Sequence, residues 1–320
     1  MRLRQYVHHI QASAERINTM TADKTGNNIV LADEQMTDFL SQHRLPSEFR
    51  RTAEQHFLPL ARRLPELRGD RNQLMLGING AQGTGKSTLA DFLRLAAESA
   101  FNWRVAVLSI DDFYYTFDER KMLAEKVHPL LRTRGVPGTH DTHMLAHYLD
   151  RLQHLKRDEH ITLPRFDKAT DDRADESRWP LIKGPIDLVI LEGWCVGTTA
   201  QPAAALVSPV NDLEREQDPD GAWRSYVNEQ LKSNYEQIFE KIDFLVFIRA
   251  PSFDAILRWR VEQEEKLADV SPEGSSGLMN DEQIENFLQF YERLTRANLA
   301  VLSNCADLVF RLDDTHSIAS

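Results

Sequence analysis

Residues 74–88, LMLGINGAQGTGKST, decide the fold of this chain. The apolar run Leu74–Ile78 is typical of a buried parallel strand, and Gly80–Ser87 match the pattern Gly-x-x-x-x-Gly-Lys-Ser/Thr in full. Helical spacing of apolar residues follows over Ser87–Ala100. A strand, a glycine-rich loop and a helix in this order predict a phosphate-binding loop, in which backbone N–H groups and a helix N-terminus surround phosphate oxygens.

We expect this loop to bind ATP together with Mg²⁺. The Lys86 amine is expected to reach the β- and γ-phosphates, and the Ser87 hydroxyl to ligate the metal. The motif alone does not separate a kinase from a GTPase, a motor or a transporter subunit, but the sequence holds no Asn-Lys-x-Asp guanine motif. The predicted nucleotide-binding residues of the loop are Gly80, Ala81, Gln82, Gly83, Thr84, Gly85, Lys86, Ser87 and Thr88.

Apolar strands alternate with helical segments through the rest of the chain. This alternation predicts an α/β fold with a doubly wound, mostly parallel sheet of about five strands. Two stretches, Thr198–Gly221 and Asp269–Asn280, are predicted to be irregular because they hold proline or glycine and few periodic apolar residues. The further predicted strands are Val105–Ile110, Ile186–Leu191, Phe244–Ile248 and Leu308–Phe310, and the further predicted helices are Asp33–Leu67, Leu145–Lys156, Trp223–Ile242, Phe253–Ala268 and Asp281–Ser303.

Acidic residues stand at the ends of two predicted strands. Asp111 and Asp112 follow Val105–Ile110, and Glu192 follows Ile186–Leu191. Ligands of open parallel sheets bind at the carboxyl edge, where these strands end. An acid there can accept a proton from a substrate hydroxyl or organise Mg²⁺. We therefore expect these acids to serve the reaction. The alternatives are a turn-capping pair for Asp111 and Asp112 and a solvent-exposed strand end for Glu192.

Composition excludes several classes of protein. The chain carries 38 Lys and Arg against 49 Asp and Glu, so its formal net charge is −11, which argues against a general nucleic-acid binder. No apolar run is long enough to span a membrane. Its two cysteines, Cys195 and Cys305, lie far apart and fit a reducing compartment, and no secretory signal is predicted at the N-terminus. We expect a cytoplasmic protein that needs no nucleic acid, membrane or protein partner.

The sequence resembles a known family in several of these segments. The loop, the acids after the second strand and Leu191–Gly193 are similar to those of the P-loop kinases that include uridine kinase, phosphoribulokinase and bacterial pantothenate kinase. A closer resemblance, over roughly Leu74–Ile318, is to the D-glycerate 3-kinase branch found in plants and fungi. It rests on Gly80–Leu89, Ser109–Tyr115, His128–Asp141, Leu163–Lys168, Glu192–Trp194, Trp259–Glu264 and Asp313–Ile318.

This resemblance implies roles for particular residues. Asp111 would be the catalytic base beside Lys86, and Glu192 would help to organise Mg²⁺. A lid helix over the nucleotide would contain Arg260. In one place the sequence departs from the family, which often has Gly-Asp-Arg where residues 171–173 read Asp-Asp-Arg, and this leaves the role of Arg173 open. The residues implied near the acceptor are His140, Asp141, Arg165 and Lys168.

The basic candidates also have a physical reading of their own. An arginine offers a bidentate fork to a carboxylate, so Arg165 and Lys168 fit an anionic acceptor, and a solvated basic surface is the alternative. Arg260 has two readings as well: a phosphate contact, or an ion pair along a helix face with the glutamates that follow it.

Together these observations predict a P-loop kinase fold. Residues 1–72 are expected to form an N-terminal helical extension, and residues 73–320 a kinase domain with a lid around 253–280. The predicted reaction transfers the γ-phosphoryl group of ATP to a hydroxyl of a small metabolite, with D-glycerate favoured. The alternatives are another small acceptor, such as pantothenate or a nucleoside, and a nucleotide-switched partner protein with slow hydrolysis.

Overall fold

A five-stranded parallel sheet forms the centre of the molecule. The computed structural model describes residues 31–270 and 280–319, and in this part of the chain the sheet has the order β2-β7-β1-β8-β9. Each strand coincides, within three residues at either end, with one of the predicted apolar runs, so the predicted doubly wound parallel sheet is confirmed. The strands are β1 (Leu74–Gly80), β2 (Val105–Ser109), β7 (Leu188–Gly193), β8 (Phe244–Arg249) and β9 (Leu308–Arg311).

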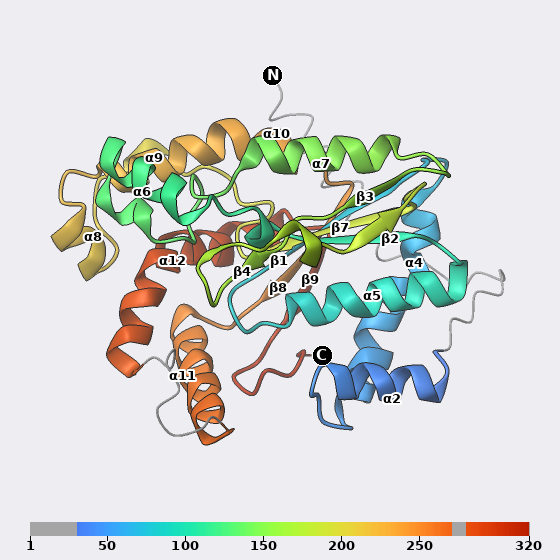
Figure 1. The fold of residues 1–320 in the computed structure, drawn as a ribbon. Coiled ribbons are helices and arrows are strands. Elements are labelled where there is room, and N and C mark those ends of the chain that lie inside the picture. Colours follow the sequence, from blue (N-terminus) through green and yellow to red (C-terminus); the bar gives the residue numbers. More distant parts are fainter. Residues whose placement is uncertain (1–30, 271–279, 320) are drawn as a thin grey trace.

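Helices cover both faces of the sheet (Figure 1). Side chains of β1 alternate between the two layers: Leu74, Leu76 and Ile78 belong to one buried cluster and Met75 to the other. On the first face lie α2 (Asp33–Gln42), α4 (Leu58–Arg68) and α5 (Lys86–Phe101). On the second face lie α7 (Thr142–His154), α9 (Ala222–Gln230) and α10 (Glu236–Phe239). Two longer helices complete the fold, α11 (Phe253–Val270) and α12 (Asp281–Val301).

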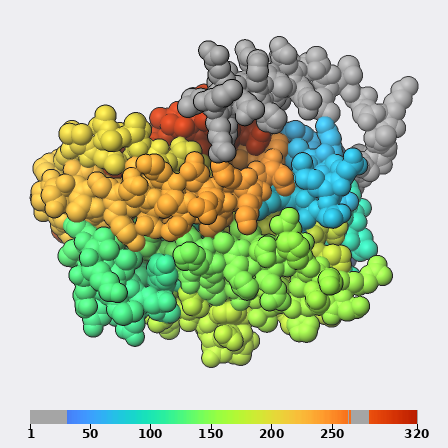
Figure 2. Space-filling model, turned by 90° about the horizontal axis from the view of Figure 1, so that it is seen from above, coloured from blue at the N-terminus to red at the C-terminus, as the bar shows by residue number. Residues whose placement is uncertain are grey.

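Figure 2 views the molecule onto this second face, where α7 and the stretch from α9 to α10 lie alongside each other. A π-helical segment, Leu231–Tyr235, joins α9 to α10. The predicted helix Trp223–Ile242 is therefore nearly continuous in the structure. The predicted helix Leu145–Lys156 begins earlier than expected, at Thr142, because the Asp141 carboxylate accepts a hydrogen bond from the Met144 amide and caps it.

The helices before β1 pack directly against α5. Phe39 and Phe57 lie edge to face with Phe92, with ring centroids 5.5 and 5.6 Å apart. All three side chains are buried in the cluster that also contains the first face of the sheet. The predicted helix Asp33–Leu67 is divided into α2, α3 (Phe49–Thr52), a π-helical segment at Ala53–Phe57 and α4. The division of the chain at residue 72 stays a prediction.

The stretch Thr198–Gly221 is more regular than predicted. It contains a 3₁₀ turn, Ala203–Leu206, and the short helix α8 (Asp212–Gln217). Two buried ion pairs hold it. Arg293 of α12 donates to both carboxylate oxygens of Glu214, at 2.7 and 2.6 Å, and Arg224 donates to Asp218 at 2.8 Å. Glu214 and Asp218 are therefore internal anchors of this stretch.

Three further features of the fold were not predicted. Helix α6 (Phe117–Lys126) has little apolar periodicity but begins with a capping box between Thr116 and Glu119. Strands β3 (His160–Thr162) and β6 (Leu181–Lys183) form one antiparallel pair. A second antiparallel pair, β4 (Phe166–Asp167) and β5 (Asp172–Arg173), forms the β4–β5 hairpin. The strands of the two pairs have too few residues to show a period in the sequence.

No helix among the residues described is long and apolar enough to cross a membrane.

Candidate active site

The loop between β1 and α5 has the conformation that its glycines require. Gly83 and Gly85 have φ of +78° and +88°, a region that residues with a side chain rarely adopt. A Cβ at Gly80 would lie 2.5 Å from Oγ1 of Thr84. Helix α5 begins at Lys86, so its first N–H groups point toward the loop. The loop thus presents backbone donors and the positive end of a helix to one place, as a phosphate site needs.

Lys86 lies inside this loop. Its Nζ donates to the carbonyl oxygen of Ala81 at 2.9 Å, and Thr84 donates to the same oxygen at 2.8 Å. Burial lowers the pKa of Lys86, whereas the carboxylates of Glu192 and Asp111 act in the opposite direction. The amine is therefore close to two acids as well as to the phosphate cradle.

Glu192 reaches the loop because β7 is the neighbour of β1. The two strands are parallel, with Ile78 opposite Glu192. The buried Glu192 carboxylate accepts a 3.0 Å hydrogen bond from the Ser87 hydroxyl at the start of α5. A hydroxyl and a carboxylate are oxygen ligands of the kind that Mg²⁺ prefers. No cluster of three or more His, Cys, Asp or Glu side chains suited to a metal occurs in residues 31–270 and 280–319.

Asp111 and Asp112 lie in a 3₁₀ turn, Ile110–Phe113, that follows β2. Their side chains point to different partners. Asp111 accepts a hydrogen bond from Lys168 Nζ at 2.7 Å and another from the Tyr114 hydroxyl at 3.0 Å. Burial tends to raise the pKa of Asp111, but the charge and hydrogen bond of Lys168 outweigh it and the net pKa is lowered. Asp111 is therefore ionised at neutral pH.

Asp112 faces the β4–β5 hairpin instead. Its carboxylate accepts hydrogen bonds from the backbone N–H of Phe166 at 3.1 Å and from Arg165 Nη1 at 3.2 Å. Burial raises the pKa of Asp112 to about 6, against the opposing effects of Arg165 and the Phe166 amide. These contacts attach the hairpin to the turn after β2, so the role of Asp112 here is structural.

The pKa of Asp112 predicts a pH dependence of stability. Because the folded protein favours the protonated carboxyl, the stability that this group contributes is fully present below its unfolded pKa and is lost as the pH rises through about 6. A rise from 3.8 to about 6 corresponds to roughly 3 kcal/mol at most. Urea unfolding of wild type and Asp112→Asn from pH 4 to 7 measures this. We expect the free energy of unfolding of the wild type, relative to the variant, to decrease with rising pH, and a flat or increasing difference would contradict the assignment.

His140 is buried beside Tyr114. Its ring stacks on Tyr114 with centroids 4.3 Å apart, and its Nδ1 lies 2.7 Å from the Tyr235 hydroxyl. Burial lowers the pKa of His140 to about 4, so the ring is neutral at neutral pH. The next residue, Asp141, caps α7 and lies 3.9 Å from Arg173. The proposed contacts of His140 and Asp141 with an acceptor stay predictions.

Arg165 and Lys168 lie on the β4–β5 hairpin, facing the acids that follow β2. Four basic side chains gather in this region, and each has an acidic partner. An anionic ligand would therefore have to compete with carboxylates of the protein itself. The pairs are Arg134 with Asp171, Arg165 with Asp112, Lys168 with Asp111 and Arg173 with Asp141.

Arg260 lies on α11, where its guanidinium contacts Glu264 one helical turn later at 2.8 Å. This is the helix-face ion pair that the sequence offered as the alternative. The proposed contact of Arg260 with a nucleotide stays a prediction. Residues 271–279 of the predicted lid and of the irregular stretch Asp269–Asn280 lie outside the described residues.

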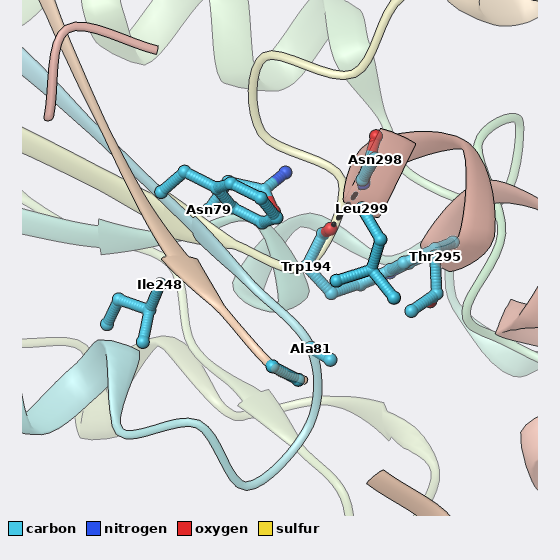
Figure 3. A pocket seen from close by; sticks show the side chains of 9 residues that line it. Asn79, Ala81, Trp194, Ile248, Thr295, Asn298 and Leu299 are labelled. Atoms are coloured by element: carbon cyan, nitrogen blue, oxygen red, sulfur yellow. Dashed lines mark hydrogen bonds between the residues drawn. The ribbon is translucent and has the colours of Figure 1, made fainter. Parts of the chain in front are cut away.

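A small cavity lies behind the loop, between the sheet and α12 (Figure 3). Asn79 and Ala81 line it from the loop side, and Asn298, which donates to the Trp194 carbonyl oxygen at 3.4 Å, lines it from α12. Its volume is about 10 Å³, which is room for about one water molecule. A nucleotide or an acceptor does not fit here, so the candidate site is the edge formed by the loop, Glu192 and Asp111.

Several residues near this edge were missed by reasoning from the sequence. Tyr114 donates to the predicted base, and Tyr235 contacts His140 and the Gly138 amide. Tyr114 was within reach, since the third residue after Asp111 shares its side of a 3₁₀ turn. No sequence signal pointed to Tyr235, which is 95 residues from His140.

The fold and this site define a P-loop nucleotide-binding protein with the architecture of a small-molecule kinase. No model of a protein family matches the chain. Individual proteins do. The chain is 35% identical over 237 residues to a protein of Schizosaccharomyces pombe described as the uncharacterized kinase mug58, and the match covers 72% of this chain and 82% of that protein. It is 30% identical over 236 residues to the chloroplastic D-glycerate 3-kinase of Arabidopsis thaliana, with 72% of this chain and 48% of that protein covered.

A solved structure agrees with these matches. D-glycerate 3-kinase from Cryptococcus neoformans superimposes with a TM-score of 0.68 and 26% identity, and the match covers 86% of this chain and 98% of that one. The chain belongs to the P-loop small-molecule kinases, in the branch that includes D-glycerate 3-kinase. It is accordingly a kinase that uses a nucleotide and acts on a small molecule.

Proposed function

We propose that this kinase transfers the γ-phosphoryl group of ATP to a hydroxyl of D-glycerate. The observation that carries the proposal is the position of the β4–β5 hairpin, which brings Lys168 within 2.7 Å of Asp111 beside the phosphate-binding loop. A cation is thus placed next to the only proposed base, where an acceptor with a hydroxyl and a negative charge can use both. The names of the relatives from Arabidopsis and Cryptococcus support the same acceptor.

The residues of the site would divide the reaction among them. The loop amides and Lys86 bind the phosphates and balance their charge. Ser87 and Glu192 would hold Mg²⁺, which when bound neutralises charge on the phosphates. Asp111 orients the acceptor hydroxyl and accepts its proton as the oxygen attacks phosphorus. Tyr114 donates a hydrogen bond to one oxygen of this carboxylate and holds it in place. The other oxygen, which accepts a hydrogen bond from Lys168 in the structure, is the one that receives the proton.

The charge pairs explain how an anionic acceptor would be selected. Lys168 must leave Asp111 before that carboxylate oxygen can accept a proton. A glycerate carboxylate offers Lys168 a second partner, and so binding of the anion uncovers the base. A neutral acceptor such as glycerol offers none, and the base stays paired. Charge complementarity thus acts on the rate as well as on binding.

Arg165→Ala is expected to raise the KM for glycerate by roughly ten- to a hundred-fold. A charge-assisted hydrogen bond contributes roughly 1.5–3 kcal/mol, and about 1.4 kcal/mol corresponds to a factor of ten. The KM for ATP should change little, because the loop supplies the phosphate contacts. Arg178→Ala is the matched control: it removes a positive charge from the same region, where Arg178 pairs with Asp167. Steady-state kinetics with both substrates on the three proteins measures the effect.

The acceptor itself is tested by release of ADP in the presence of glycerate, glycerol, pantothenate and a nucleoside. We expect glycerate to be used far better than glycerol. Equal use of the two would refute the anionic acceptor while leaving the kinase intact. Release of ADP with pantothenate or a nucleoside alone would replace glycerate as the substrate, and release that depends on a protein partner would favour the nucleotide-switched alternative.

A further inference from the structure

We propose that Asp171 is a positioning residue, which together with Arg120 and Arg134 holds the β4–β5 hairpin so that Lys168 stays beside Asp111 until an acceptor binds. The role of Lys168 in this inference rests on the proposed function. The contacts of Asp171 with Arg120 and Arg134, here called the tether, are observed in this chain. Asp171 lies in the turn between β4 and β5, three residues after Lys168.

The first observation is the burial of Arg120. This residue lies on α6, and its side chain is 1% exposed, which is rare for an arginine without partners. Its guanidinium donates to three separate segments: the carbonyl oxygen of Tyr115 at 3.1 Å, that of Arg132 at 2.8 Å and that of Asp171 at 2.7 Å. It also contacts the Asp171 carboxylate at 2.9 Å. Arg120 therefore joins the turn after β2, the segment before Arg134 and the hairpin.

The second observation is that the Asp171 carboxylate has two cationic partners. One oxygen faces Arg120, and the other forms an ion pair with Arg134. Arg134 in turn donates weakly, at 3.5 Å, to the carbonyl oxygen of Lys168. Loss of this one carboxylate would leave the buried Arg120 without its charge partner and would release Arg134.

The third observation is the backbone at this position. Asp171 has φ of +56°, in the left-handed region that favours glycine and that aspartate and asparagine tolerate better than other residues. Glycine would meet the conformational requirement without a side chain. An aspartate accepts some strain here, and its carboxylate supplies the two ion pairs. This accounts for residues 171–173 reading Asp-Asp-Arg.

The position of Lys168 depends on this tether because burial does not fix it. The Lys168 side chain is 62% exposed, and its amine donates to Asp111 at 2.7 Å. A long, exposed lysine has many rotamers, so its average position follows the backbone of the hairpin. A hairpin held by Arg120 and Arg134 keeps the amine at the base, whereas a loose hairpin does not.

The experiment compares Asp171→Gly, Asp171→Asn and the control Asp172→Asn. Glycine removes the carboxylate and relieves the positive φ, so the variant is expected to fold. Asparagine keeps the tolerance for this φ but carries no charge. Asp172 is the neighbouring acid on β5, and its side chain accepts a local hydrogen bond from the Arg173 amide. Its variant should behave like the wild type in every measurement below.

Three measurements test whether Asp171 holds the hairpin and Lys168 in place. Amide hydrogen exchange of residues 165–174 should be faster in both Asp171 variants, with the central sheet unchanged. Acetylation of the Lys168 amine, followed by mass spectrometry against the exposed Lys183, should also be faster because the amine leaves Asp111. The KM for glycerate should rise about tenfold while the KM for ATP stays the same, since a displaced cation no longer meets the acceptor.

The outcomes separate this inference from the proposed function. If hydrogen exchange and Lys168 labelling in Asp171→Gly equal those of the wild type, the tether does not exist and the inference is overturned. If exchange is faster but Lys168 labelling is unchanged, Asp171 stabilises the hairpin without positioning Lys168, which also overturns it. If the wild type does not use glycerate at all, the proposed acceptor is wrong, and the first two measurements still decide on the tether because neither needs an acceptor.

Discussion

Asp111→Asn is expected to lower kcat by about 10²–10⁴-fold, the range found when a general base is removed. The carboxylate lies at the carboxyl edge of the sheet, receives hydrogen bonds from Tyr114 and Lys168, and has a lowered pKa, so it is ionised and oriented before the acceptor binds. Asparagine has nearly the same shape and can keep the bond from Tyr114, but it cannot accept the proton. The kcat at saturating ATP and acceptor measures the loss.

Asp112→Asn is the matched control for this experiment. Asp112 is the adjacent acid of the same turn, and its carboxylate is turned toward Arg165 and the Phe166 amide. We expect a change in kcat of less than tenfold, together with the altered pH dependence of stability described above. If Asp112→Asn is the more damaging of the two substitutions, the base is Asp112 and the assignment is reversed.

Lys86→Ala is expected to lower kcat by at least about 10²–10³-fold, the loss typical for removal of one group that stabilises charge in a transition state. The Lys86 amine lies in the phosphate-binding loop, close to Glu192 and Asp111, so it is placed to balance the charge of the transferring group. The measurement is ADP release under single-turnover and steady-state conditions, with the thermal midpoint recorded in parallel.

Lys183→Ala serves as the control, because Lys183 is an exposed lysine on β6, in the other antiparallel pair. It should keep wild-type kinetics. The thermal midpoint of Lys86→Ala should stay near that of the wild type, since the Lys86 side chain contributes only one hydrogen bond to a loop carbonyl. A variant that stays folded and retains wild-type kcat would remove the basis for assigning the loop to catalysis.

The fold was predictable from the sequence wherever local patterns carry the information. Strands β1, β7 and β8 are buried on both faces and therefore read as continuous apolar runs. The loop between β1 and α5 was predictable because glycines at positive φ, followed by a helix, are a requirement of a few adjacent residues. Glu192 was predictable as a site residue because it ends a strand, and parallel strands end at one edge.

The ion-pair partners of the site residues could not be predicted from the sequence. The sequence placed Arg165 and Lys168 near the acceptor through the family resemblance and as members of a basic segment. Such a segment looks the same whether it is solvated or paired. The structure joins Lys168 to Asp111, 57 residues away, and Arg165 to Asp112, 53 residues away. Arg120, on a helix with almost no apolar periodicity, gave no sign that it would be buried.

The sequence by itself therefore determined the parallel sheet, the phosphate-binding loop and the two strand-end acids, because each depends on residues that are neighbours in the chain. Only the tertiary structure decided which of the two adjacent carboxylates pairs with Lys168, which one pairs with Arg165, and that Asp171 meets the buried Arg120. Those choices depend on segments about 50 residues apart coming within hydrogen-bond distance. The sequence does not show which residue a charged side chain will pair with, because the packing of the chain decides which two groups come together.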